Sequence, residues 1–316
     1  MQNCIKGGIM LERYKENPIL KPIESHSWES KMVFNAGAIY LNEKVHLLYR
    51  ASDMNEKSTL GYAASQDGFH IDERLDSPVF SPQSELDYLG VEDPRIIMIG
   101  NRLHIVYTAY GRVPGMDDKL RKDTRIPQIA LTSISVDDFL HHNWNFSERV
   151  YPLPGVIDKD VVIFPKRFNE KYVIYHRVSP HIWICYSNDL KNWYDHNILM
   201  SPEQEWEYFK VGPSAPLIKT EKGWLFIYHG VSRTHVYRIG FAFIDLEDPT
   251  RIIYRHPEPI LEPEMEYEKE GVIPMVVFTN GAVLKDDTIF VYYGGADTVI
   301  GVATAPLSRF FELAGL

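Results

Sequence analysis

The sequence has few cysteines, few basic residues and no long hydrophobic run. Its 316 residues include two cysteines, Cys4 and Cys185, and neither belongs to a CxxC or Cys/His spacing, so neither a disulfide framework nor a zinc site is indicated. The longest stretch without charge, Gly271 to Leu284, contains a proline and is too short to span a bilayer. The N-terminus lacks the apolar core of a signal peptide. We therefore expect a cytoplasmic protein without membrane contact.

The charge balance excludes another class of partner. Lysine and arginine total 33 and aspartate and glutamate total 43, which gives a net charge of −10. Because an extended nucleic-acid-binding surface needs excess positive charge, we expect no nucleic-acid partner. With 45% hydrophobic residues the chain has ample material for a core. We expect residues 1–9 to be disordered or to precede the native start, for which Met10 is a candidate.

An internal repeat predicts the architecture. A short β-rich segment that ends in an aromatic and a polar residue recurs about every 60 residues. The five copies, at 45–50, 103–108, 172–177, 224–229 and 289–293, are marked by Tyr49, Tyr107, Tyr175, Tyr228 and Tyr292. Five such units account for nearly the whole chain, so we expect residues 1–316 to form one domain.

Each unit has the same internal order. A first strand leads through a turn rich in Asn, Gly or Lys into the marker strand, and a strand of small and apolar residues follows. Three units close on a proline-containing phrase typical of an outer edge strand, at 78–82, 198–202 and 259–263. Four-stranded units repeated in this way predict an all-β fold, a five-bladed β-propeller.

The last unit lacks its closing phrase. A matching phrase, Asn17 to Pro22, stands instead before the first unit. We expect this N-terminal segment to complete the last blade and close the ring, because closure removes an open sheet edge.

Polar residues stand at the starts of four of the five predicted first strands, where pattern rules would place apolar ones. Since the innermost strands of a propeller surround its central channel, these side chains would face one another although they are far apart in sequence. The starts are Phe34 to Ala38, Val91 to Arg95, Asp158 to Val162, Phe209 to Pro213 and Val276 to Phe278.

Four motifs occur in order along the chain. They are Asn35-Ala36-Gly37-Ala38, Gly90-Val91-Glu92-Asp93-Pro94-Arg95, the segment from Gly223 to Gly230 and the segment from Tyr292 to Asp297. In this order they resemble the signatures of glycoside hydrolase family 130, the five-bladed β-mannoside phosphorylases and related mannosidases. The resemblance runs from about Asn17 to the C-terminus. It implies inverting phosphorolysis of a β-mannoside, of the β-1,4-manno-oligosaccharide or mannosyl-glucose type or of the β-1,2 type, with release of α-mannose 1-phosphate.

The resemblance assigns Asp93 as the general acid. Asp93 would protonate the leaving oxygen through the mannose 3-hydroxyl while inorganic phosphate, in place of water and its base, attacks the anomeric carbon from the opposite face. Holding a proton near neutral pH requires a raised pKa, to which the neighbouring Glu92 could contribute. From the residues alone, Asp93 could instead cap the turn before Pro94 and pair with Arg95.

The resemblance places phosphate at Lys159, Arg177, Lys210 and His229, with Tyr237 as a weaker match. Several fixed cations suit a phosphate. The two lysines open predicted first strands, and Arg177 and His229 end the strands beside them. A single lysine is more often a solvated surface residue, and His229 could be a core histidine whose ring is simply hydrogen-bonded.

Sugar contacts are assigned to Asn35, Arg50, Arg95 and Asp297, since arginine forks and carboxylate acceptors suit vicinal hydroxyls. Arg50 and Arg95 could instead form structural ion pairs with aspartates of the ring.

Aromatic residues and one long loop are further candidates. Tyr62, Tyr110 and Trp206 could stack on sugar faces, although most of the aromatic residues, 13% of the chain, must serve packing. The polar loop from Gly111 to Pro127 could be a solvated surface loop, which we favour, or a lid or subunit contact.

Two positions depart from the family pattern. Ala36 stands where many members have proline, and Lys159-Asp160 stands where many have Arg-Asn. Lysine binds phosphate as a point charge, and Asp160 could repel phosphate or activate water as a base. An inverting exo-β-mannosidase and a carbohydrate-binding propeller without catalysis are therefore kept as alternatives. We expect no metal and no cofactor beyond phosphate, and a homo-oligomer is left open.

Overall fold

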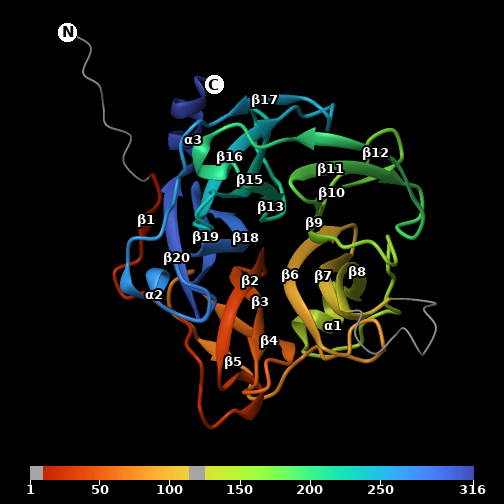
Figure 1. Ribbon diagram of the computed structural model, residues 1–316, viewed down its shortest axis with the longest axis vertical. Coiled ribbons are helices and arrows are strands. Elements are labelled where there is room, and N and C mark those ends of the chain that lie inside the picture. Colours follow the sequence, from red (N-terminus) through yellow and green to blue (C-terminus); the bar gives the residue numbers. More distant parts are fainter. Residues whose placement is uncertain (1–9, 114–124) are drawn as a thin grey trace.

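The computed structural model describes residues 10–113 and 125–316. Within these ranges the structure is mostly β, and its strands gather around a common centre (Figure 1). Residues 1–9 and most of the loop at 111–127 lie outside the described ranges. The described helices are short, and none has the length and apolar composition that crossing a bilayer requires.

The described strands fall into five groups that follow the chain order. The first contains β2 (Met32–Leu41), β3 (Lys44–Ser52), β4 (Ser58–Ser65) and β5 (Glu73–Arg74), and the second contains β6 (Gly90–Ile99), β7 (Arg102–Arg112) and β8 (Arg125–Ser135). The third contains β9 (Lys159–Ile163), β10 (Tyr172–Val178), β11 (His181–Ser187) and β12 (Trp193–Met200). The fourth contains β13 (Lys210–Pro213), β14 (Ile218–Lys219), β15 (Trp224–Val231), β16 (Tyr237–Ile244) and β17 (Ile252–Arg255). The fifth contains β18 (Val277–Lys285), β19 (Thr288–Gly295), β20 (Val299–Pro306) and β1 (Glu12–Arg13).

Helices are few and peripheral to these groups. The α-helices are α1 (Val136–Leu140), α2 (Glu266–Lys269) and α3 (Leu307–Ala314), and single 3-10 turns occur at Ser27–Glu29 and Glu205–Glu207. A parallel bridge between Ser58 and Gly90 joins the first two groups into one sheet. The first strands β2, β6, β9, β13 and β18 lie nearest the centre (Figure 1).

The predicted hairpin turns are confirmed. The five marker segments lie in β3, β7, β10, β15 and β19. Between β2 and β3, Asn42 and Glu43 have φ of 50° and 61°. Paired left-handed residues give a tight turn whose twist suits the flanking strands. Asn169-Glu170 and Asp286-Asp287 repeat this conformation.

In three of the groups, a buried glutamate carboxylate accepts hydrogen bonds from a tyrosine hydroxyl and from an arginine. Tyr49 donates to Glu29 at 2.9 Å, and Arg74 of the outer strand β5 donates to the same carboxylate at 2.6 Å. The same arrangement joins Glu207 to Tyr228 and Arg255, and Glu268 to Tyr293 and Arg13. The equivalent tyrosine of the fifth unit is therefore Tyr293, and the choice of Tyr292 as its marker is corrected by one residue.

Apolar clusters fill the spaces between the groups. Four clusters each combine buried residues from two consecutive groups. A fifth combines the first group with the last, where Val33 and Leu47 share a cluster with Phe290 and Val302. Each group thus has apolar neighbours on both of its faces.

The N-terminal segment forms the outer edge of the fifth group. Arg13 of β1 pairs with Ala303 of β20, and Leu20 forms a further bridge with Ile300. Leu11 and Leu20 are 2% and 3% exposed. The expected pairing of the Asn17–Pro22 segment with the last unit is observed, and β1 adds a second contact that the sequence pattern did not indicate.

Deletion of residues 1–22 should lower the melting temperature strongly. It removes the buried pair of Arg13 with Glu268 and two buried leucines, and truncating one buried leucine typically costs about 2–5 kcal/mol. Because ~1 kcal/mol corresponds to roughly 2–4 °C in a large domain, calorimetry should show a fall of at least about 8 °C. Leu20→Ala should produce part of this fall, whereas Lys15→Ala, whose side chain is 84% exposed, should not. A truncated protein that melts like the parent would contradict this role.

Candidate active site

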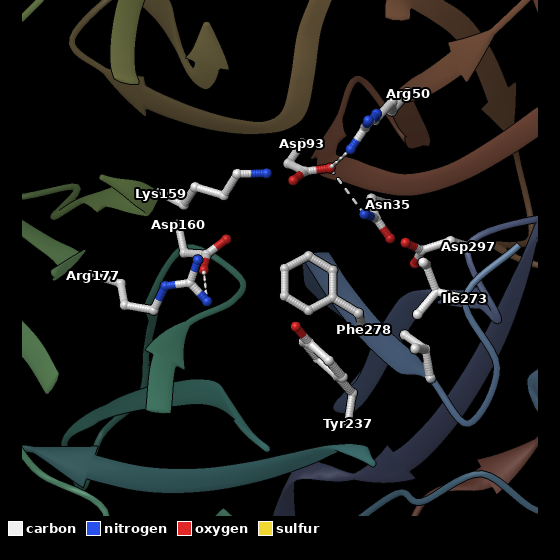
Figure 2. A pocket seen from close by; sticks show the side chains of 11 residues that line it. Asn35, Arg50, Asp93, Lys159, Asp160, Arg177, Tyr237, Ile273, Phe278 and Asp297 are labelled. Atoms are coloured by element: carbon white, nitrogen blue, oxygen red, sulfur yellow. Dashed lines mark hydrogen bonds and ion pairs between the residues drawn. The ribbon is translucent and has the colours of Figure 1, made fainter. Parts of the chain in front are cut away.

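A polar cavity of about 200 Å³ lies where the first strands meet. Seven of the ten predicted site residues line it, and in Figure 2 Lys159 and Arg177 lie on one side and Arg50, Asn35 and Asp297 on the other. The lining residues, which come from all five groups, are Asn35, Arg50, Asp93, Lys159, Asp160, Arg177, Tyr237, Ile273, Val276, Phe278 and Asp297.

Irregular backbone places several of these polar side chains. Asn35, Asp93 and Asp160 have φ of 50°, 53° and 57°, at points where β2, β6 and β9 shift register against their neighbours. A bulge redirects the side chain of the extra residue, and left-handed residues other than glycine carry strain typical of functional sites. The bulges explain why polar residues interrupt strands that are otherwise apolar.

The carboxylate of Asp93 is held by hydrogen bonds from two side chains. Its Oδ1 accepts hydrogen bonds from Nδ2 of Asn35 at 2.9 Å and from the guanidinium of Arg50 at 3.2 Å. Burial raises the pKa of Asp93, but the charges of Arg50 and Lys159 and the Asn35 hydrogen bond outweigh it, so the pKa lies below its ordinary value. The expectation of a raised pKa is therefore wrong for this structure.

Glu92 binds two of the cations around the cavity. Its carboxylate accepts from Arg50 at 2.7 Å and from Nζ of Lys159 at 3.1 Å. Glu92 thus fixes Arg50 and Lys159 on either side of Asp93. We expected Glu92 to raise the pKa of Asp93, and its observed role is instead to pair with these two cations.

Asp160 is the most completely paired acid of the site. It is 2% exposed, and its carboxylate lies 3.2 Å from Arg95, 3.1 Å from Arg177 and 3.7 Å from Nε2 of His229. Burial raises its pKa, but Arg177, His229 and Arg95 together hold the pKa well below its ordinary value. Asp160 therefore joins three strands, β6, β10 and β15, through one buried charge.

Arg95 lies behind the cavity and does not line it. The residue is fully buried. Its guanidinium donates to Asp160 and to the main-chain oxygens of Asp93, Pro213 and Ser214, at 2.6 to 3.2 Å. The predicted sugar contact at Arg95 is therefore wrong, and the alternative of a structural ion pair is confirmed. Arg95 donates to the main-chain oxygen of Asp93 and not to its carboxylate. The alternative ion pair between Arg95 and the Asp93 carboxylate is therefore not observed.

His229 is also a supporting residue and not a cavity residue. It is fully buried, its Nδ1 lies 3.1 Å from Oγ of Ser214, and its ring stacks on Tyr237 with centroids 6.0 Å apart. Burial lowers the pKa of His229 to about 3, so the ring carries no charge for phosphate at neutral pH. His229 does not line the cavity, and its phosphate contact stays a prediction.

Lys210 stands beside the cavity next to Tyr237. Its Nζ lies 5.2 Å from the centre of the Tyr237 ring. Burial, with the nearby charge of Arg177, lowers the pKa of Lys210 to about 8. Lys159, Arg177 and Tyr237 line the cavity, whereas Lys210 does not line it and lies against the Tyr237 ring.

Asp297 differs from the other two aspartates. Burial raises its pKa to about 6 although Arg50 opposes the shift, and the charge of Asp93 adds to the increase. Asp297 also has a left-handed backbone, with φ of 52°. At pH 7 this carboxyl is therefore mostly ionised, and it takes up a proton as the pH falls through about 6.

Comparison with known proteins identifies the family. A family model described as beta-1,4-mannooligosaccharide phosphorylase matches residues 10–314. The chain belongs to glycoside hydrolase family 130. A 1,2-beta-oligomannan phosphorylase of Thermoanaerobacter sp. strain X514 is 46% identical over 303 residues, which cover 93% of this chain and 97% of the relative. A beta-1,2-mannobiose phosphorylase of the same strain is 44% identical over 307 residues, covering 93% and 96%.

A solved structure supports the same assignment. The beta-1,2-mannobiose phosphorylase from Listeria innocua, in complex with beta-1,2-mannobiose, matches with a TM-score of 0.81 and 28% identity. The match covers 96% of this chain and 99% of that chain.

Apolar residues of this family 130 site were missed by the sequence analysis. Ile273, Val276 and Phe278 line the cavity. They belong to the uncharged stretch from Gly271 to Leu284, in which we expected Val276 to Phe278 to start a first strand but assigned no residue to the site. Long uncharged runs at the start of a predicted first strand were the signal that could have found them.

A second cavity of about 480 Å³ adjoins the first and shares Arg50, Ile273 and Asp297 with it. Tyr110, one of the aromatic candidates for sugar stacking, lines this cavity together with Tyr88.

The other two aromatic candidates serve packing. Tyr62 is 1% exposed and its hydroxyl pairs with Nδ1 of His46 at 2.8 Å. Trp206 packs on Tyr228 and donates its Nε1 proton to the main-chain oxygen of Pro257 at 2.8 Å.

The long polar loop can be placed only at its ends. Arg125 lines the second cavity, and Arg112 pairs with Glu85. Residues 114–124, on which the choice between surface loop, lid and subunit contact depends, lie outside the described residues.

Proposed function

We propose that this family 130 chain is an inverting phosphorylase that cleaves β-mannosides with inorganic phosphate and releases α-mannose 1-phosphate. The observation that carries the proposal is the polarity of one cavity. Asn35, Arg50 and Asp297 lie on one side of it, Lys159 and Arg177 lie on the other, and Asp93 lies between the two sides (Figure 2). In-line inverting attack requires an acid at the leaving oxygen and a phosphate site on the opposite face of the sugar, and Asp93 and the cations Lys159 and Arg177 can supply these two parts.

Asp93 acts as the general acid in this proposal. Its proton passes to the leaving oxygen, by way of the mannose 3-hydroxyl, as the bond from C1 to that oxygen breaks and a phosphate oxygen forms the new bond to C1. The low pKa of Asp93 depends on Lys159 and Arg50. Phosphate bound beside Lys159 offsets part of that positive charge, and a bound sugar excludes water, so both substrates raise the pKa of the acid.

Phosphate is bound by Lys159, Arg177 and Lys210, with Tyr237 donating from the cavity wall. Arg177 offers a planar fork to phosphate and Lys159 a point charge. Asn35, Arg50 and Asp297 bind the mannose hydroxyls. Beyond inorganic phosphate as co-substrate the proposed reaction uses no cofactor.

The linkage that we now favour is β-1,2, because the two relatives at 46% and 44% identity are both named for that linkage. The second cavity, which meets the first at Asp297, would bind the leaving-group sugar. Tyr88 and Tyr110 offer it aromatic surfaces.

Pairing at Asp160 disfavours the hydrolase alternative. A hydrolase needs a carboxylate that takes a proton from water, and Asp160 was the candidate. Its contacts with Arg95 and Arg177, and a pKa held well below the ordinary value, make it a poor base.

We further propose that the described groups are the five blades of a single propeller domain, with the ring closed by the N-terminal segment. The shared cluster of the first and last groups and the pairing of β1 with β20 support this reading. The low cysteine count supports a cytoplasmic location.

Incubation with β-1,2- and β-1,4-mannobiose, with and without inorganic phosphate, tests the function. We expect mannose 1-phosphate in the presence of phosphate, with the β-1,2 disaccharide cleaved faster. Release of mannose without phosphate would identify a hydrolase, and no turnover of either disaccharide would favour a binding protein.

Asp93→Asn should lower kcat by about 10²- to 10⁴-fold, the usual contribution of a general acid, because an amide cannot deliver the proton. The melting temperature should stay close to that of the parent, since the two side chains have the same shape. Asp137→Asn, at a side chain 86% exposed, is the matched control and should keep full activity. An active Asp93→Asn enzyme would show that another group is the acid.

The phosphate affinity should follow the charge of Lys210. Because its pKa is lowered to about 8, Lys210 is charged below that pH and loses its charge above it, so the KM for phosphate should rise between pH 7 and pH 9. Lys210→Met should raise this KM at pH 7 by roughly 10- to 100-fold, as expected for a lost charged hydrogen bond, and should flatten the pH dependence. Lys210→Arg should keep a low KM at pH 9, since arginine stays protonated.

Lys222→Met, at an exposed turn position, is the control for a general loss of positive charge. If Lys210→Met and Lys222→Met gave the same KM for phosphate, Lys210 would have no place in the phosphate site.

A further inference from the structure

A second cluster of reactive side chains lies in the third strand group, outside the cavity. His176 of β10, Cys185 of β11 and His196 of β12 each offer one ligand atom, and these atoms all lie within 4.8 Å of one another. The proposed reaction uses none of the three. We propose that they bind a zinc ion.

The sheet register brings these residues together. Cys185 pairs with Ile174, two residues before His176, so strand alternation places His176 and Cys185 on the same face. On the other side of β11, Ile184 pairs with Asn197, which places His196 beside Cys185. The three ligands thus form a row across neighbouring strands.

His176 is already oriented as a metal ligand. The residue is 2% exposed, and its Nδ1 lies 2.6 Å from Oδ2 of Asp158. A carboxylate only accepts, so Nδ1 carries the proton and Nε2 presents its lone pair. Nε2 is buried and has no hydrogen-bond partner in the part of the chain that the structure describes. Carboxylate-bound histidines of this kind are the usual partners of zinc, and an unpartnered buried nitrogen is otherwise costly.

The direction of Nε2 follows from the strand order. Asp158 directly precedes β9, which borders β10 on one side, whereas Cys185 and His196 lie on β11 and β12 on the other side. With Nδ1 bound to Asp158, the opposite edge of the ring faces the two remaining ligands.

The donor set suits Zn²⁺. Two imidazoles and a thiolate are common zinc ligands, with bond lengths of about 2.0–2.1 Å to nitrogen and 2.3 Å to sulfur, which place ligand atoms roughly 3.5 Å apart. The site must therefore contract by up to about 1.3 Å from the observed separation of up to 4.8 Å. His196, exposed on the edge strand β12, has room to make this movement and leaves a side open for a water ligand. Cys185 binds as the thiolate and releases its proton to solvent.

Zinc at this position would act on the neighbouring active site through the backbone. It ties β10, β11 and β12 together and, through Asp158, holds the start of β9. Lys159 directly follows Asp158, and Arg177 directly follows His176. The metal therefore steadies the two strand ends that carry cations of the cavity, and the expectation of no metal is replaced by this proposal.

Direct metal binding tests the site. The full chain carries Cys4→Ser, so that any thiolate signal comes from Cys185. After removal of metal with a chelator, Zn²⁺ is titrated in competition with a chromophoric chelator, and Co²⁺ is used as a spectroscopic substitute. We expect one zinc per chain, a thiolate-to-cobalt charge-transfer band, and a higher melting temperature with zinc than without it.

Two variants separate this site from adventitious binding. Cys185→Ser should abolish the charge-transfer band, and His196→Ala, at an exposed residue whose removal should spare the fold, should weaken zinc binding by at least about tenfold. His141→Ala, at another exposed histidine, 67% exposed, should bind zinc like the parent. The proposal is overturned if the parent does not bind zinc, or if zinc binds equally well to His196→Ala and Cys185→Ser.

Discussion

The buried carboxylate of Asp160 is the interaction on which the active site depends. A charge that is 2% exposed persists only when it is paired. Arg95 of β6 and Arg177 of β10 supply the charged partners, and the uncharged ring of His229 from β15 lies 3.7 Å away, so that three strand groups meet at this carboxylate. Arg95 directs its remaining contacts to main-chain oxygens of Asp93, Pro213 and Ser214. Asp93, the acid of the proposed reaction, is thereby positioned through Arg95, which does not line the cavity.

Burial and neighbouring charges shift the pKa values of two cavity aspartates in opposite directions. Arg50, Lys159 and Asn35 outweigh burial at Asp93 and lower its pKa, whereas at Asp297 burial wins and the pKa rises to about 6. Asp93 is thus ionised beside the cations that we assign to phosphate. The proposed reaction requires phosphate to offset those cations before Asp93 can hold a proton, so phosphate binding and proton uptake are coupled in this site. The pairing at Asp160 leaves that residue as a fixed negative charge, which in the proposed reaction makes it a poor base for activating water.

Much of the fold could be predicted because its signals are local. Alternation of side chains and left-handed turn residues such as Asn42-Glu43 act within a few residues, so the marker strands and hairpins were found where the structure has them. The buried carboxylates that brace three groups were not found, since Glu29 meets Tyr49 and Arg74 only after distant segments have packed. The strand β1 was not predicted for the same reason. The histidine and cysteine cluster of the third group has no motif spacing, because its members stand on three separate strands.

For the active site, the sequence by itself determined the candidates, and tertiary structure decided their use. Residue types and motif order named ten residues, of which seven line the cavity. Arg95 and His229 belong to the same sequence motifs as the residues that line the cavity, but both side chains are fully buried. The pattern within a strand does not distinguish a side chain that reaches the cavity from one that ends beneath its wall. The pKa of Asp93 was expected to rise and instead falls, since it depends on Arg50 and Lys159 from two other strand groups. Which residues can carry the chemistry is a local property, whereas burial and charge pairing arise only when strands far apart in the chain converge.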